Sequence, residues 1–192
     1  MAGEAMGFDA LRGAPVRMAA NAEGARRRER ILFVVLVAVA HTITYLVVGA
    51  LAFAFLTHGL YEGADPLFGS YLRTPGEADL WQHVTTWFLP AQLFRGALLG
   101  LALSPFLEVL HGWSVWRRAL AVAGLYLVFG FWAAAVAAPG NIEGLVYLRP
   151  EFSLDVVLRV QPEIILQGAA MSAVVAIGIG RFAGKGRGWL RR

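Results

Sequence analysis

The feature that most constrains this chain is its longest apolar stretch, which runs from Ile31 to about Leu56 without a charged residue. A helix rises about 1.5 Å per residue, so about 20 apolar residues cross the hydrocarbon core of a bilayer. The stretch therefore predicts a transmembrane helix. It is too long for the apolar part of a secretory signal peptide, which has about 7–15 residues, and thirty residues precede it.

Three further apolar segments are long enough to cross a bilayer. The sequence predicts four spans in all, at about 31–56, 84–107, 119–138 and 160–180. The last is free of charge only from Ile164 to Gly180, so the sequence leaves open whether residues 156–162 enter the membrane or lie at its surface. We expect an all-α integral membrane protein with four transmembrane helices.

The composition agrees with this fold class. Charged residues make up 16% of the chain, against about 25% in soluble domains. The chain has no cysteine, which excludes a disulfide framework and cysteine-ligated zinc or iron–sulfur sites. The basic residues flank the apolar segments and form no stripe on a soluble face, so the pI of about 10.0 does not indicate a nucleic-acid partner.

The basic residues predict how the spans are oriented, because Lys and Arg gather on the cytoplasmic side of a membrane. With four spans, thirteen of the 17 basic residues fall on one side. The opposite side holds Arg73, Arg149 and Arg159 together with eight of the 13 acidic residues. We therefore expect both termini in the cytoplasm and a location in the cytoplasmic (inner) membrane.

The two ends of the chain are basic and polar. We expect residues 1–30 to form a mobile cytoplasmic arm and residues 181–192 to form a cytoplasmic tail, on either side of a transmembrane domain of residues 31–180. The arginines of residues 26–30 either bind anionic lipid or serve only as a topology signal.

The two halves of the chain share an order of short motifs. Tyr-Leu-Arg occurs at residues 71–73 and 147–149, and Gly-Ala follows at residues 96–97 and 168–169. Two parallel helical hairpins, related by an axis along the membrane normal, would give this order. The spacings between the motifs differ, so chance similarity is the alternative.

Small residues recur every four positions in the second and fourth spans, along one face of each helix. They are Gly96, Gly100 and Ser104 in the second span and Gly168, Ser172, Ala176 and Gly180 in the fourth. Helices in lipid associate through faces of this kind. We predict that these two helices pack directly against each other.

Arg95 is the one charged residue within the second span. It lies about 12 Å along the helix from Trp87, which suits the membrane interface. A charge at that depth costs about 2.5–3.5 kcal/mol on insertion scales, so it needs a partner or water. Gln92 lies one turn outward, and Glu163 and Gln167 are expected at matching depth on the fourth span. We predict an Arg95–Glu163 ion pair, which either lines an anion-binding pocket or fixes the helix register.

Two more polar residues are candidates for the same site. His41 lies about 15 Å into the first span, where it would relay a proton, act as a ligand, or make a hydrogen bond to a neighbour such as Gln92. Glu143 lies in a Pro-Gly-Asn-Ile-Glu-Gly turn after the third span, and either approaches Arg95 or faces water. No second histidine is expected at mid-membrane, so we expect no haem held by two histidines, no metal and no other cofactor.

These residues favour a polar site between the second and fourth helices, open to the outer side of the membrane. It would bind or pass a small polar or anionic solute, alone or as a homo-oligomer. Two other functions remain open. One is a non-catalytic accessory subunit or assembly factor of a larger membrane complex. The other is an enzyme acting on a lipid or isoprenoid substrate, with Glu163 or Glu143 as the acid–base group.

Overall fold

The computed structural model describes residues 6–63, 66–152 and 154–186, with side chains from residue 21 to residue 181 within those ranges. This part of the chain is helical apart from short connections. Its α-helices are α1 (Met6–Ala52), α2 (His58–Tyr61), α3 (Ala78–Leu103), α4 (Leu107–Gly112), α5 (Val115–Gly124), α6 (Ile142–Tyr147) and α7 (Leu154–Gly186).

Short turns of other helix types join several of these helices into longer ones. A π-helical turn, Phe53–Thr57, joins α1 to α2, and a 3₁₀ turn, Ser104–Phe106, joins α3 to α4; α5 continues as a π-helix, Leu125–Trp132. Four of the resulting helices are long and apolar enough to cross a membrane: Asn21–Tyr61, Ala78–Gly112, Val115–Trp132 and Leu154–Arg181. The prediction of four apolar helices of this length is confirmed.

The bounds of the helices differ from the predicted spans. Residues 6–30 form the N-terminal part of α1, and α7 begins at Leu154, so that residues 156–162 are helical. The third helix ends at Trp132 and not near residue 138. The Asn141 side chain explains this early end, because it accepts hydrogen bonds from the Ala138 and Gly144 amides and donates one to the Val136 carbonyl. These bonds hold the chain in a turn instead of a further helical turn.

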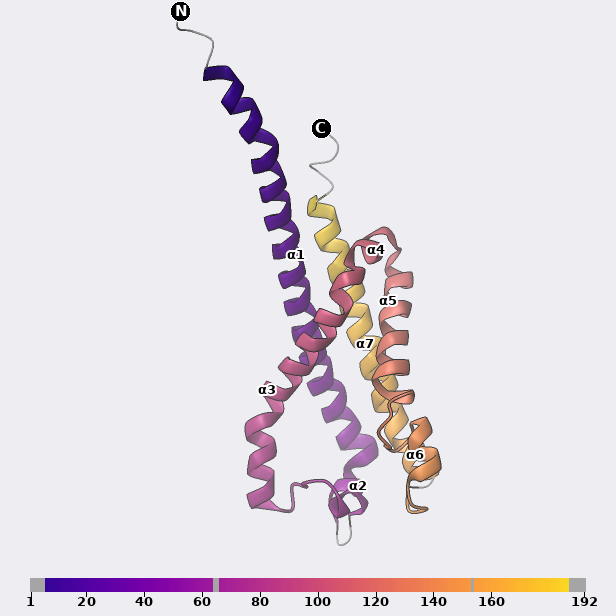
Figure 1. Ribbon diagram of the computed structural model, residues 1–192. Coiled ribbons are helices and arrows are strands. Elements are labelled where there is room, and N and C mark those ends of the chain that lie inside the picture. Colours follow the sequence, from indigo (N-terminus) through magenta and orange to yellow (C-terminus); the bar gives the residue numbers. More distant parts are fainter. Residues whose placement is uncertain (1–5, 64–65, 153, 187–192) are drawn as a thin grey trace, which may run out of the picture.

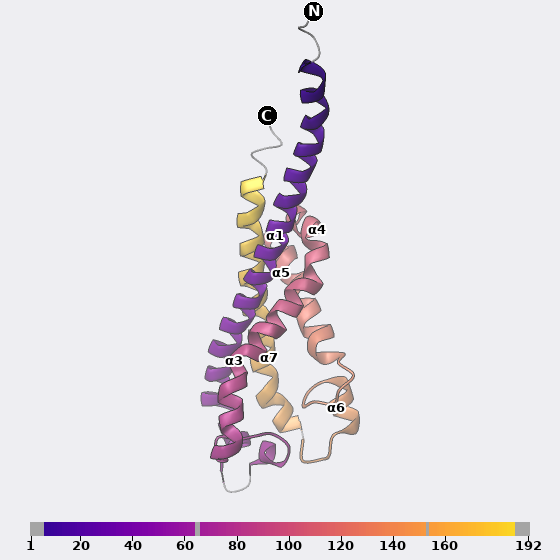
Figure 2. The ribbon, with the colours of Figure 1, turned by 60° about the vertical axis from the view of Figure 1, so that its left-hand side comes forward.

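Both termini lie at one end of the bundle, and α2 and α6 lie at the other (Figure 1). We call these the termini end and the loop end. Helix α1 packs against α3 and α7, and α7 packs against α5. Helix α3 crosses α1 near the middle of the bundle and diverges from it towards the loop end (Figure 1), while α1 extends past the other helices at the termini end in both views (Figures 1 and 2).

The crossing of α1 and α3 depends on two glycines. A Cβ atom on Gly96 would lie 2.7 Å from the Cα of Ala38, and one on Gly100 would lie 2.8 Å from the Cα of Val34. The two backbones are therefore in direct contact, which is how helices associate where lipid replaces water.

The predicted pairing of the small faces of the second and fourth spans is wrong. The small face of α3 is occupied by α1, and the small face of α7 is occupied by α5 and its π-helical continuation. Gly168 lies against the Tyr126 and Leu127 side chains, and Gly180 lies against Arg118. The second spanning helix meets α7 at α4. The stripes of small residues were read correctly as contact faces, but the sequence does not indicate which helix each face meets.

Arg118, near the start of α5, ties three helices together at the termini end. Its side chain is only 6% exposed. Its Nε donates to the Leu110 carbonyl at 2.7 Å, one Nη donates to the His111 carbonyl at 3.1 Å, and the other donates to the Ala176 carbonyl of α7 at 3.3 Å. Leu110 and His111 lie in the last turn of α4, where the carbonyl ends of the helix attract a cation; the Leu110 carbonyl also accepts from the Trp113 amide at 3.1 Å.

Candidate functional site

A cavity of about 650 Å³ lies between the loop-end halves of α1 and α3, where the two helices diverge. Its volume is within the range of small-molecule sites, about 300–1,000 Å³. Most of its lining comes from the first two spanning helices and their connection, and α7 adds one residue. The lining residues are Tyr45, Leu46, Gly49, Ala50, Phe53, Thr57, Tyr61, Glu62, Pro75, Trp81, Val84, Thr85, Phe88 and Glu163.

Glu163 is the residue that α7 contributes to this cavity. Its carboxylate lies against α1 at Gly49, where a Cβ atom would lie 3.4 Å from the Glu163 Oε1. Glu163 is half-buried, and within the described residues no hydrogen bond or ion pair holds it. An ionisable side chain inside a spanning helix is costly and usually functional, so Glu163 is the leading candidate of this site.

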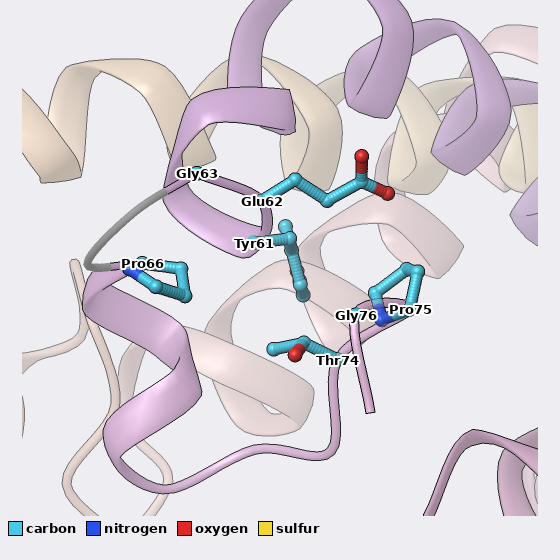
Figure 3. Close-up of a pocket in the computed structure, with 7 residues that line it drawn as sticks. All are labelled: Tyr61, Glu62, Gly63, Pro66, Thr74, Pro75 and Gly76. Carbon is cyan, nitrogen blue, oxygen red and sulfur yellow. The ribbon is translucent and has the colours of Figure 1, made fainter. Parts of the chain in front are cut away.

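A smaller cavity of about 290 Å³ adjoins the first one at the loop end. The two share Tyr61, Glu62 and Pro75 in their linings. Figure 3 shows Tyr61 and Glu62 on one wall of the smaller cavity, with Thr74 and Pro75 facing them. The shared residues place Glu62 at the boundary between the loop end and the interior, where its Oε2 lies 3.1 Å from the His58 Nε2, a contact that becomes an ion pair when His58 is protonated.

His41 and Gln92 are joined across α1 and α3. The His41 Nε2 donates to the Gln92 Oε1 at 3.2 Å, since an amide oxygen can only accept. His41 is 0% exposed, and its ring centroid lies 6.0 Å from those of Tyr45 and Tyr126. The predicted helix–helix hydrogen bond of His41 is confirmed. Tyr45 also lines the cavity, so the Tyr45 ring lies between His41 and the cavity.

Three buried polar atoms near this pair have no hydrogen-bond partner among the described residues: the His41 Nδ1, the Gln167 Nε2 and the Ser172 Oγ. The contacts Gly49–Glu163 and Gly178–Leu36 fix how α1 runs alongside α7. In that register Ser172 is level with His41, and Gln167 lies about one turn closer to the loop end. The interior is therefore polar at this level, although the rest of the core is apolar.

Arg95 does not pair with Glu163, and that prediction is wrong. Arg95 is exposed on α3 and does not line the cavity, and none of the ion pairs among the described residues includes it. The cause is rotational, because Gly96 and Gln92 turn towards α1 and residue 95 lies about 100° around the helix from residue 96.

The remaining predicted residues are placed apart from the cavity. Glu143 lies in the first turn of α6, and neither Glu143 nor Gln167 lines the cavity. The aromatic lining, represented by Tyr45, Trp81 and Phe88, was not predicted from the sequence. Trp81 and Phe88 lie near the start of the second span, where aromatic residues are typical of the membrane interface. Tyr45 lies in the middle of the first span, and nothing in the sequence indicates that its ring lines a cavity.

No protein-family model matches the chain, and neither the curated proteins nor the solved structures compared with it gave a match. A function is therefore inferred from the chain's own residues.

Proposed function

We propose that the chain is a multi-pass protein of the cytoplasmic membrane whose cavity between α1 and α3 binds or passes a small solute from the outer side. The observation that carries the proposal is Glu163, a half-buried carboxylate without a hydrogen bond or ion pair among the described residues, at the wall of a cavity of about 650 Å³. The sequence predicted the solute site between the second and fourth helices, with Arg95 as its charged group. We place the site in this cavity instead, with Glu163 as its charged group.

The orientation in this proposal comes from the basic residues. Most of them lie in the segments at the termini end, which indicates a cytoplasmic position for that end. The loop end, with Glu62 and the mouth of the cavity, would then face outward. A chain of four spanning helices leaves little room for a wide pathway, so passage of a solute would favour a homo-oligomer.

Cysteine labelling tests whether the cavity opens to the outer side. The natural chain has no cysteine, so Ala50→Cys creates a single thiol on the cavity wall. We expect a membrane-impermeant maleimide added from outside to label it, and a bound solute to slow the labelling. Leu51→Cys is the matched control, since Leu51 is 55% exposed on the same helix but does not line the cavity. Equal and negligible labelling at both positions would exclude an outward-open cavity.

A second function is favoured by Arg95. An exposed charge in a spanning helix, with no ion pair in the part of the chain that the structure describes, would be stabilised by a carboxylate from another membrane protein. This is the arrangement expected of an accessory subunit in a larger membrane complex. Arg95→Leu is then expected to release the protein from that complex and to leave labelling of Ala50→Cys unchanged. Retention of Arg95→Leu in the complex would exclude this role.

A further inference from the structure

We infer that the cavity between α1 and α3 takes an organic cation with an apolar body, an inference that rests on the proposed function and names the class of its solute. Three features carry the inference: the sign of the charged groups in the lining, its aromatic surface, and the position of Arg95 outside it.

The charged residues of the lining are both acidic. They are Glu163 on α7 and Glu62 after α2, and the lining contains no lysine, arginine or histidine. Glu62 already contacts His58, whereas Glu163 has no ion-pair partner among the described residues. A cation in the cavity would form an ion pair with Glu163, whereas an anion would be repelled by both Glu163 and Glu62.

Aromatic side chains make up much of the remaining wall. They are Tyr45, Phe53, Tyr61, Trp81 and Phe88. The ring centroids of Tyr45 and Phe88 lie 5.6 Å apart, and those of Phe53 and Tyr61 lie 5.7 Å apart, so rings from two helices surround the space. The faces of aromatic rings attract cations, while their hydrocarbon surface favours an apolar ligand body. A small hydrated inorganic cation would gain little from such a wall.

The position of Arg95 agrees with this preference. Arg95 is the basic residue that the sequence places in the second span, and the structure turns it away from the lining. The acidic residues of the loop-end connections, such as Glu77 and Asp79 beside Trp81, would raise the local concentration of cations at the mouth.

Two probes of nearly equal size and shape and opposite charge test the inference directly. Tetraphenylphosphonium carries one positive charge, and tetraphenylborate carries one negative charge. Equilibrium dialysis of each radiolabelled probe against the purified full chain in detergent, with protein-free micelles subtracted, gives its affinity. We expect saturable binding of the phosphonium at least tenfold tighter than binding of the borate.

Variants of Glu163 connect that preference to the cavity. Glu163→Gln is expected to weaken phosphonium binding at least tenfold, and Glu163→Asp, which keeps the charge, is expected to restore most of it. Glu151→Gln is the matched control, because Glu151 pairs with Arg149 at 3.2 Å and does not line the cavity. Circular dichroism and gel filtration of each variant report folding, so that a misfolded variant is not scored as a loss of binding.

The outcomes separate the solute class from the cavity itself. Binding of the borate tighter than binding of the phosphonium would overturn the cationic class. Equal binding of the two probes, both to the natural chain and to the Glu163→Gln variant, would also overturn it. If Ala50→Trp then abolished this binding, the cavity would still be supported as the binding site. Failure of both probes to bind, together with no labelling of Ala50→Cys from outside, would overturn the class and the proposed function alike.

Discussion

His41 shows how one polar contact can hold two spanning helices in register. It is buried between α1 and α3, and its Nε2 meets the Gln92 Oε1. Neither side chain could find water at this depth, so each depends on the other for a partner. Measured interhelical hydrogen bonds of this kind contribute about 0.6 kcal/mol on average and up to about 1.7 kcal/mol.

We expect His41→Leu and Gln92→Leu to be coupled in a double-mutant cycle. The coupling free energy should be about 0.5–1.7 kcal/mol, because either substitution alone removes the shared bond. The free energy of unfolding in mixed micelles is measured by titration with a denaturing detergent. Its differences between the natural chain and each of the two single variants and the double variant give the coupling. The changes in the free energy of unfolding caused by His41→Leu and Gln82→Leu should be additive, since Gln82 is exposed and lies ten residues from Gln92 on α3. Additivity in the first cycle would show that the bond contributes nothing.

The burial of a polar residue in a span can be predicted from sequence, but its direction around the helix axis is harder to predict. His41, Gln92 and Glu163 were all assigned to the buried or half-buried polar region, where the structure places them. Arg95 was predicted to face Glu163, but the contact of Gly96 with Ala38 turns residue 95 away from the interior. The spacing of Gly96 and Gly100 marks a contact face, but the sequence does not indicate that α1 occupies it.

At the scale of whole helices, α1 packs against two of the other long helices, while α5 packs against α7. Both α3 and α7 contact α1, and the closest approach is where Gly96 and Gly100 meet its backbone. The sequence predicted that such small residues mark contact faces, but pairing them by shared spacing alone gave the wrong partner. Helices whose small residues share the same spacing could pack with one another equally well, so the spacing alone does not identify which pairs form in the bundle.

We expect Gly96→Ala to destabilise the bundle by about 1–3 kcal/mol, the usual cost of adding a methyl group to a closed contact. The added Cβ would meet the Cα of Ala38 at 2.7 Å and its carbonyl oxygen at 2.9 Å, and backbone atoms cannot turn aside. The free energy of unfolding in micelles measures the effect. Gly124→Ala is the control, since no atom lies within 4 Å of a Cβ there; equal effects of the two would mean that the crossing is looser than described.

We expect Arg118→Leu to destabilise the termini end of the bundle by about 2 kcal/mol, because three hydrogen bonds from a charged group are lost. Thermal unfolding followed by circular dichroism in micelles measures the loss. Arg117→Leu removes the same charge from an exposed neighbouring position and should change stability little. If both substitutions acted alike, the hydrogen bonds of Arg118 would contribute nothing to stability beyond its charge.

At the scale of the whole molecule, the structure joins two regions of different character. The termini-end half contains a continuous apolar core that includes Phe33, Val37, Met171, Val175 and Ile179. The loop-end half is opened by the divergence of α3 from α1 and contains the cavities at Glu62 and Glu163. A closed half supporting an open half is suited to a site that must accept a ligand and keep its shape.

We expect both termini to lie on the cytoplasmic side. In single-cysteine variants, a membrane-impermeant maleimide added to intact cells should label Tyr147→Cys, which lies on α6 and is 72% exposed. Arg27→Cys should be labelled only after the membrane is opened, because it lies in the basic part of α1. The reverse pattern would place the cavity mouth in the cytoplasm.

The position of Glu163 along α7 has an electrical consequence. It lies three residues inside the fourth span predicted at residues 160–180, which is about 5 Å along the helix axis, roughly a sixth of a hydrocarbon core about 30 Å thick. In the proposed orientation, a monovalent cation that reaches Glu163 from outside would cross roughly a sixth of the transmembrane voltage, worth about 0.4 kcal/mol for every 100 mV. With the interior negative, the affinity of the cavity for the cation would rise about twofold per 100 mV, so an energised membrane would itself favour binding.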